Sequence, residues 1–148
     1  APFDPVAARE AKKLGLKEGP ELGKLQQGKT ITLSGKKIKP EEVTYLVEGK
    51  TIGYIPDTAA CAACMKIAED CNILICESTY HSAEEEKAEL YKHMTARQAA
   101  TIASQANVEK LILTHFSQRY KSVEELEKEA KDIFPNTIAA YDFMKVEI

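Results

Sequence analysis

The sequence predicts an α/β layered fold in which short buried strands alternate with helices. After Asp57, the apolar runs Ile73-Leu74-Ile75-Cys76 and Leu111-Ile112-Leu113 are separated by longer stretches with helical spacing. Uninterrupted apolar runs of this length are typical of strands that are buried on both faces. The chain has 148 residues, of which 44% are hydrophobic, and this suffices for one domain with a buried core.

The first part of the chain predicts smaller elements. Ala-rich sequence indicates a helix over Val6–Leu14, with Gly15 as its stop signal. Gly23 and Gly28 predict a loop after it. The alternation of Thr30–Leu33, followed by a turn at Ser34-Gly35-Lys36, predicts a pair of strands.

The later elements follow in order. Val43–Val47 and Thr51–Ile55 are β-rich runs joined by Glu48-Gly49-Lys50, which predicts a hairpin. A final strand is expected near Ile138–Ile148. Strands are also expected over Asn72–Cys76 and Lys110–Thr114, and helices over Thr58–Glu69, Ser82–Tyr91, Thr95–Ala106 and Ser122–Ile133, the last opening with a capping box.

Charge and composition exclude some classes of function. The net charge is −3, which disfavours a non-specific binder of polyanions. No apolar run approaches the roughly 18 residues of a membrane helix, and no secretory leader stands at the start, so no membrane partner is expected. The four cysteines crowd between Cys61 and Cys76 instead of spreading as a disulfide framework, which favours a reducing, cytoplasmic setting.

Three candidate site residues follow predicted strands. Asp57, Glu77 and His115 each end a strand, and ligands bind at the carboxyl edge of open α/β sheets. A carboxylate and an imidazole at one edge can converge on zinc, although a zinc site takes about four ligands. The alternative is that Asp57 caps the next helix and His115 is a hydrogen-bonded residue at a strand end.

Glu77 and His93 form a second candidate pair. A carboxylate that holds an imidazole in one tautomer is what a general acid requires. The alternative is an exposed His93 in a helix–helix turn and a Glu77 in a surface salt bridge.

The remaining motifs are less specific. Cys61-x-x-Cys64 invites a zinc or redox interpretation, but Cys71 and Cys76 do not repeat that spacing, and two cysteines on one helix face more often pack as small apolar residues. Lys24 and Lys29, with lysines of the opening helix, form either a strip that contacts phosphates or a solvated face.

Taken together, these residues resemble the ribonuclease Z family, the transfer-RNA 3′-processing endonucleases of the metallo-β-lactamase superfamily. The matching motifs cover essentially the whole chain. They are Gly19-Pro20-Glu21-Leu22-Gly23-Lys24-Leu25, Ile55-Pro56-Asp57-Thr58, Cys76-Glu77-Ser78-Thr79-Tyr80, His93-Met94-Thr95-Ala96-Arg97-Gln98-Ala99-Ala100 and Leu113-Thr114-His115-Phe116-Ser117-Gln118-Arg119-Tyr120.

The resemblance implies a role for each matching residue. Asp57 would bridge two zinc ions and His115 would ligate one of them. Glu77 would orient His93, which would assist departure of the ribose 3′ oxygen, while Thr95 would hold this turn. Lys24 and Thr95 are the residues expected to bind the substrate, precursor transfer RNA, and the complete enzyme would be a cytoplasmic homodimer.

The chain departs from the family pattern in three places. Pro56 stands where Gly usually precedes the bridging Asp, and Met94 replaces a Ser. The superfamily's His-x-His-x-Asp-His signature is missing, because the only histidines are His81, His93 and His115. We therefore expect the carboxyl-terminal half of a metallo-β-lactamase αββα sandwich, a mixed sheet with flanking helices, that is inactive alone.

Within that half, residues 1–28 would be the returning limb and base of the arm that grips transfer RNA. Three other interpretations remain open at this stage. They are another metallo-β-lactamase-fold phosphodiesterase or sulfatase, a non-catalytic module, and a redox or zinc domain built on Cys61 and Cys64.

Overall fold

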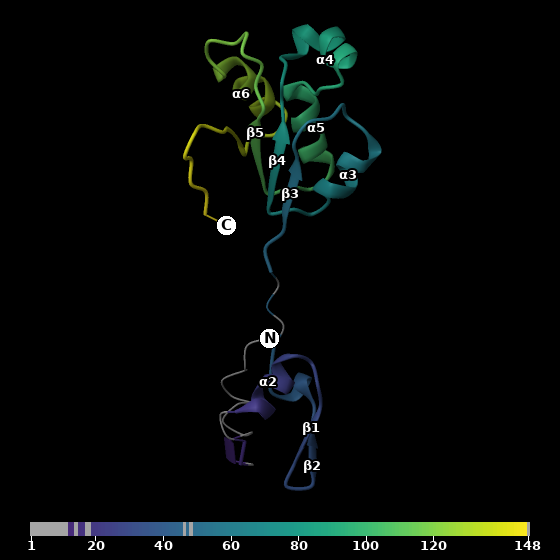
Figure 1. Cartoon of the computed structure of the whole chain (residues 1–148), viewed down its shortest axis with the longest axis vertical. Coiled ribbons are helices and arrows are strands. Elements are labelled where there is room, and N and C mark those ends of the chain that lie inside the picture. Colours follow the sequence, from purple (N-terminus) through teal and green to yellow (C-terminus); the bar gives the residue numbers. More distant parts are fainter. Residues whose placement is uncertain (1–11, 14, 17–18, 46, 48, 148) are drawn as a thin grey trace. The chain divides into compact units, whose positions relative to one another are not determined.

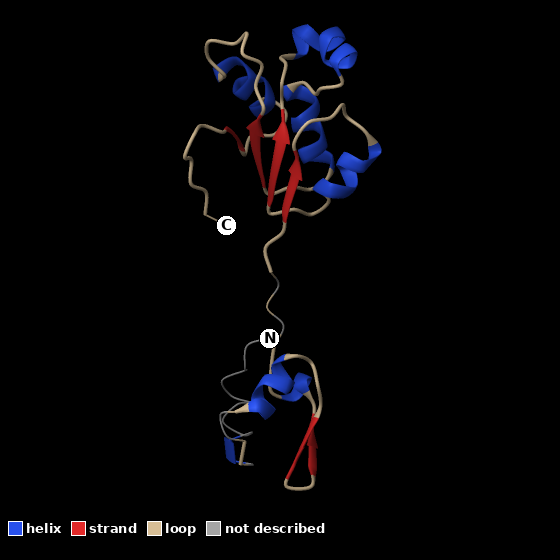
Figure 2. Ribbon diagram, viewed as in Figure 1, coloured by secondary structure: helices blue, strands red, loops and turns tan. Residues whose placement is uncertain are grey.

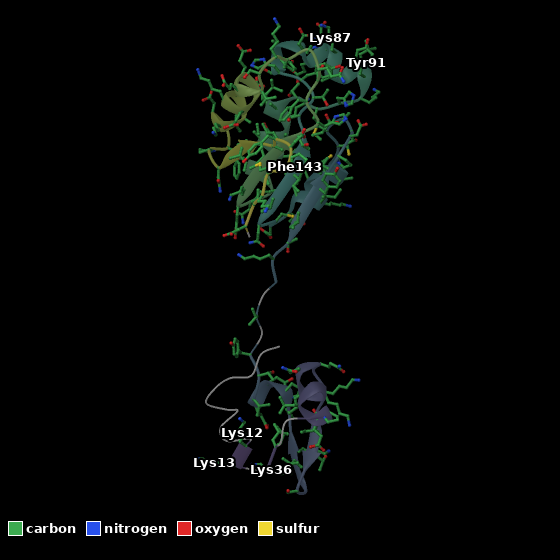
Figure 3. All side chains as sticks on the ribbon, turned by 60° about the vertical axis from the view of Figure 1, so that its left-hand side comes forward. Lys12, Lys13, Lys36, Lys87, Tyr91 and Phe143 are labelled. Atoms are coloured by element: carbon green, nitrogen blue, oxygen red, sulfur yellow. The ribbon has the colours of Figure 1, made fainter. Side chains whose placement is uncertain are left out.

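The computed structural model describes residues 12–13, 15–16, 19–45, 47 and 49–147 (Figures 1 and 2). The chain divides into two compact units, Ala1–Gly49 and Lys50–Ile148. The predicted helix over Val6–Leu14 lies outside the described residues except for Lys12 and Lys13, which are helical and exposed (Figure 3).

The first unit contains a helix, a hairpin and a short 3-10 turn. Its elements are α2 (Pro20–Gln26), β1 (Ile31–Leu33), β2 (Lys36–Ile38) and η1 (Pro40–Glu42). The predicted strand pair is confirmed, since Ile31 lies opposite Ile38 in an antiparallel register. Both positions of its turn, Ser34 and Gly35, have positive φ, as a tight hairpin requires.

The predicted loop over Gly23 is wrong, because this glycine lies within α2. Pro20 occupies the first turn of that helix, where its missing N–H costs nothing. Burial also outweighs the low helix propensity of glycine, because Leu25 is fully buried and Leu22 packs on the same small core.

The second unit is a parallel four-stranded sheet with helices between the strands. Its order is β3-β4-β5-β6. Its strands are β3 (Ile52–Ile55), β4 (Ile73–Glu77), β5 (Lys110–Thr114) and β6 (Thr137–Ala139), and its helices are α3 (Ala62–Ala68), η2 (Ser82–Glu84), α4 (Glu85–Tyr91), α5 (Ala96–Gln105) and α6 (Glu124–Lys131).

The predicted hairpin of Val43–Val47 with Thr51–Ile55 is wrong. β3 pairs in parallel with β4, with Ile52 opposite Ile73, and the described residues of Val43–Val47 belong to none of the named strands. The chain returns through α3 between these two strands, and such a crossover makes neighbouring strands parallel.

The core lies on one face of this sheet. Alternate residues of the strands, among them Ile55, Leu74 and Leu111, pack against buried residues of α3, α5 and α6. Gly53 belongs to the same face, and a Cβ there would lie 2.9 Å from the carbonyl oxygen of Ile67, so glycine permits the close approach of α3.

The opposite face of the sheet carries an apolar row. Tyr54, Ile75, Ile112 and Ile138 lie side by side in register, and Tyr54 at the edge strand is 59% exposed. The helices α3, α5 and α6 pack on the other side of the sheet, and this face is exposed only in part, because Ile112 in the centre of the row is 6% exposed. A half-sandwich is expected to expose such a face.

Several boundaries differ from the prediction. α3 begins at Ala62 and not at Thr58, because the residues from Asp57 to Cys61 form a non-helical loop after β3. The predicted capping box of α6 does not form: Val123 is the N-cap, and Ser122 Oγ accepts from the N–H of Glu124 at 3.2 Å. The last strand ends at Ala139 instead of continuing toward the terminus.

The α/β fold class is confirmed. The parallel sheet and the antiparallel hairpin together give both kinds of strand pairing, with helices flanking the sheet. β3, β4 and β5 all point the same way, so their carboxyl ends share one edge (Figure 1). Among the described residues, none of the helices has both the length and the apolar character needed to span a bilayer.

Candidate metal and general-acid site

Four predicted site residues meet at the carboxyl edge of the sheet. Asp57 follows β3, Glu77 ends β4, His115 follows β5, and His93 lies between α4 and α5. One ligand atom of each lies within 4.8 Å of the others, and this is the one such group in the described part of the chain.

The sheet register accounts for this convergence. Glu77 lies opposite Thr114 in the sheet, so His115 follows one residue after the position that pairs with Glu77. The N–H of Ser78 continues the ladder by donating to the carbonyl of Thr114 at 2.9 Å. His115 itself has φ 59°, a conformation that is uncommon for a residue with a side chain and that breaks the strand at the site.

Glu77 is fully buried, and both of its oxygens are occupied. Oε1 accepts from the N–H of Thr58 at 2.6 Å and faces Nδ1 of His93 at 3.3 Å. Oε2 accepts from the hydroxyl of Thr79 at 2.7 Å and from the N–H of Met94 at 2.9 Å. A carboxylate with four such partners is a fixed hydrogen-bond acceptor rather than a free metal ligand.

His93 faces two carboxylates through the same nitrogen. Its Nδ1 lies 3.1 Å from Oδ1 of Asp57, in addition to the contact with Glu77. The turn is set by Lys92, which ends α4 with φ 63°, and by the N–H of His93, which donates to the carbonyl of Ala88 at 2.8 Å. Two carboxylate acceptors around Nδ1 favour a ring hydrogen at that nitrogen.

Thr79 joins the two histidines. Its Oγ1 lies 2.9 Å from Nδ1 of His115 and 3.3 Å from Nδ1 of His93. The hydroxyl has one hydrogen, and the charged oxygen of Glu77 is its strongest acceptor. A Thr79 hydroxyl that donates to Glu77 accepts from Nδ1–H of His115, and that tautomer leaves the lone pair of His115 on Nε2 for a metal ion.

Asp57 and His115 fit a metal ion. Both are exposed, and the Asp57 side chain is 60% exposed, so their free atoms are accessible from solvent. Carboxylate oxygen and imidazole nitrogen are ligands that zinc takes. Two ligands are fewer than the four of a closed zinc site, so the remaining ligands must come from elsewhere.

Neither of the two predicted substrate-binding residues is among the four that meet at this edge. Thr95 is fully buried and caps α5: its hydroxyl accepts from the N–H of Gln98 at 3.2 Å, while Gln98 returns a bond to the N–H of Thr95. It holds the turn after His93, as expected, and a direct contact with substrate stays a prediction. Lys24 is exposed on α2 of the first unit, and its role also stays a prediction.

Sequence reasoning missed the residues that support the site. Thr79 was part of a quoted motif without a role, although it lies two residues after Glu77 and therefore on the same face of an extended chain. Glu129, on the charged helix α6, is 7% exposed and accepts from both the N–H and the hydroxyl of Ser82. The same carboxylate lies 3.5 Å from Nε2 of His81.

Comparisons with known proteins assign this fold, with its polar residues at the carboxyl edge of the sheet, to a known superfamily. The chain belongs to the family described as the Beta-lactamase superfamily domain, whose model matches residues 23–116. The match includes Asp57, Glu77, His93 and His115.

Individual relatives identify a more specific group within this superfamily. Ribonuclease Z of Nitrosopumilus maritimus is 44% identical over 94% of this chain, and ribonuclease Z of Methanothermobacter thermautotrophicus is 43% identical over 91%. The crystal structure of the short form of human tRNase Z matches 76% of the chain at 27% identity with a TM-score of 0.54. These alignments confirm the resemblance to the ribonuclease Z family.

The chain spans about half the length of the curated relatives it matches. The aligned part is 47% and 44% of the two ribonucleases Z, and 36% of the human structure. The activity of the complete relatives therefore depends on a protein about twice as long as this chain.

Proposed function

We propose that this chain is the carboxyl-terminal half of a zinc-dependent endoribonuclease that removes the 3′ trailer of precursor transfer RNA by phosphodiester hydrolysis. The observation that carries the proposal is the meeting of the Glu77–His93 pair with Asp57 and His115 at one edge of the sheet. Relatives named ribonuclease Z supply the substrate class.

Asp57 and His115 are proposed as ligands of the metal, with two zinc ions in the complete enzyme. Bound zinc would supply Lewis-acid activation of water and of the phosphate. Oγ1 of Thr79 lies 2.9 Å from Nδ1 of His115 and would hold a hydrogen there, so that Nε2 would be the nitrogen that binds the metal.

His93 is proposed as the general acid. Glu77 and Asp57 would hold the Nδ1–H of a doubly protonated ring, whose second proton, on Nε2, would pass to the ribose 3′ oxygen as the bond from phosphorus to that oxygen breaks. Glu77 orients the ring and does not itself lose its four partners, which keeps the ring fixed during the transfer.

The other half of the enzyme is proposed to complete the site. It would carry the His-x-His-x-Asp-His signature and cover the apolar row of Tyr54, Ile75, Ile112 and Ile138, and relatives of twice this length leave room for such a half. The complete protein is proposed to be a cytoplasmic homodimer. Residues 1–28, with Lys24, are proposed as the base of an arm that contacts transfer RNA.

The test compares this chain with the complete protein on a precursor transfer RNA that carries a 3′ extension. With zinc present, the complete protein should cut at the 3′ side of the acceptor stem, and this chain alone should cut little or not at all. Mapping of the product ends distinguishes processing from general ribonuclease activity. Hydrolysis of small phosphodiesters or sulfate esters without cleavage of the precursor would contradict the proposal and favour a different hydrolase of the superfamily.

A further inference from the structure

The proposed function leaves the cysteines unused, and two of them lie together. Sγ of Cys61 lies 3.6 Å from Sγ of Cys64, and all four cysteines are free thiols. Cys61 is exposed, whereas Cys64 is 2% exposed. A reagent in solution can therefore reach the sulfur of Cys61, whereas the sulfur of Cys64 is shielded from solvent.

The backbone around the pair allows the sulfurs to approach further. A disulfide has an S–S length of about 2.05 Å, so a closing movement of about 1.5 Å joins them. Cys61 is extended at the N-cap of α3, with φ −150° and ψ 169°, and its chain before the helix lies outside regular structure. Side-chain rotation and this segment, rather than the helix, take up the movement.

The two thiols differ in a way that suits thiol–disulfide exchange. Hydrogen bonds from the Cys64 backbone N–H and its side chain lower the pKa of the Cys61 thiol, which favours the nucleophilic thiolate at the exposed position. Burial raises the pKa of the Cys64 thiol, which keeps it protonated until Cys61 has reacted.

The other two cysteines, Cys71 and Cys76, lack the exposed thiol that the Cys61–Cys64 pair has. Cys71 is 1% exposed, and its Sγ–H donates to the carbonyl of Ile67 at 3.1 Å. Cys76 is fully buried within β4, and burial raises the pKa of its thiol. Both are structural thiols by these criteria.

We propose that Cys61 and Cys64 form a reversible dithiol–disulfide site whose co-substrate is a small disulfide such as oxidised glutathione. The Cys61 thiolate attacks one sulfur of the small disulfide, which gives a mixed disulfide and releases one thiolate. Cys64 then loses its proton and attacks Sγ of Cys61, and the mixed S–S bond breaks to release the second thiolate. The two thiols lose two electrons to the small disulfide, and their two protons end on the two released thiolates.

The experiment uses the full 148-residue chain with a chelator present, so that its outcome does not depend on the proposed zinc site. The chain is equilibrated with mixtures of oxidised and reduced glutathione, quenched in acid, alkylated and analysed by peptide mass. The original chain should lose two hydrogens in mass through a Cys61–Cys64 bond and retain no glutathione. Cys61 should also react with iodoacetamide at least about tenfold faster than Cys71 or Cys76.

Matched variants separate the two steps. Cys64→Ser should keep one glutathione on Cys61, because no thiol resolves the mixed disulfide, and Cys61→Ser should leave Cys64 reduced. Cys71→Ser is the control and should behave as the original chain does. Since Cys64 is buried, Cys64→Ala serves the same purpose if the serine variant loses its far-ultraviolet circular dichroism. Accumulation of glutathione on Cys61 in the original chain, a bond to Cys71 or Cys76, or thiols that stay reduced throughout would each overturn the proposal.

Discussion

The candidate site has an inner part and an outer rim, and they are built differently. The inner part is Glu77, Thr79 and His93, in which both oxygens of Glu77, the hydroxyl of Thr79 and Nδ1 of His93 face partners within the chain. The outer rim is Asp57 and His115, whose side chains are exposed and retain free ligand atoms. The difference indicates that this chain holds the proposed proton-transfer group in place alone, whereas the proposed metal site requires further ligands.

The largest expected effect is on the inner part. In the complete protein, His93→Ala should lower turnover on precursor transfer RNA by about 100- to 10,000-fold, because general-acid assistance is typically worth that much. Its zinc content should change little, since Nδ1 of His93 faces carboxylates. Single-turnover cleavage and atomic absorption measure the two quantities. A loss of turnover of only a few-fold would remove His93 from the chemistry.

The rim should respond in the opposite way. Asp57→Ala or His115→Ala in the complete protein should lower zinc affinity by more than about 100-fold, because even supporting residues of metal sites are worth about 10- to 100-fold. The thermal midpoint of the metal-free protein should stay close to that of the original, since both side chains are exposed. Asp132→Ala, which removes an exposed carboxylate on the second unit, is the control. Full zinc occupancy in either rim variant would contradict the assignment.

The inner part should also matter for folding, which the rim should not. Glu77→Gln replaces one acceptor oxygen by an amide donor that faces another donor in a fully buried position. We expect the free energy of unfolding of this chain to fall by about 2–4 kcal/mol. Urea unfolding followed by circular dichroism measures it, with exposed Glu125→Gln as the matched control. Equal stability of the two variants would show that the buried network does not hold the site together.

Thr79 connects the two regions, so its hydroxyl should matter more than its bulk. Thr79→Val keeps the shape and removes the hydroxyl, and it should weaken zinc binding by about 10- to 100-fold, while Thr79→Ser should retain most of it. Nitrogen-15 NMR of the imidazoles should report the hydrogen on Nδ1 of His115 in the original and serine chains, and a mixture of tautomers in the valine chain. Identical spectra in all three chains would mean that Thr79 does not fix the tautomer.

The sequence predicts which residues end the strands at the site, but it does not predict the hydrogen-bond partners that hold them. Asp57, Glu77 and His115 were placed together because each ends a strand, and parallel strands end at one edge. The partners of Glu77 were not predictable in this way, since the N–H groups of Thr58 and Met94 come from loops whose path depends on packing. The burial of Glu129 was not predictable for a related reason: its partner Ser82 is 47 residues away in the sequence, and the hydrogen bond between them depends on how α6 packs.

The smallest expected effect lies outside both parts of the site. Lys24 is an exposed residue of α2 in the first unit, and the resemblance to ribonuclease Z assigns it to substrate binding. If it contacts one phosphate, Lys24→Ala in the complete protein should weaken binding of precursor transfer RNA by about 2- to 10-fold and reduce the slope of log affinity against log salt by about one. Filter binding over a series of salt concentrations measures both.

Hydrolysis of a small phosphodiester separates this role from the chemistry. It should be unchanged in Lys24→Ala, because a small substrate has no further phosphate groups for Lys24 to contact, whereas His93→Ala should impair hydrolysis of any diester whose leaving group needs a proton. Lys66→Ala, which removes an exposed lysine on α3, tests whether any surface charge has the same effect. If Lys66→Ala changes the salt slope as much as Lys24→Ala, the attraction is general to the surface. A change confined to Lys24→Ala would instead make recognition of transfer RNA a property of the first unit, separable from the site on the second.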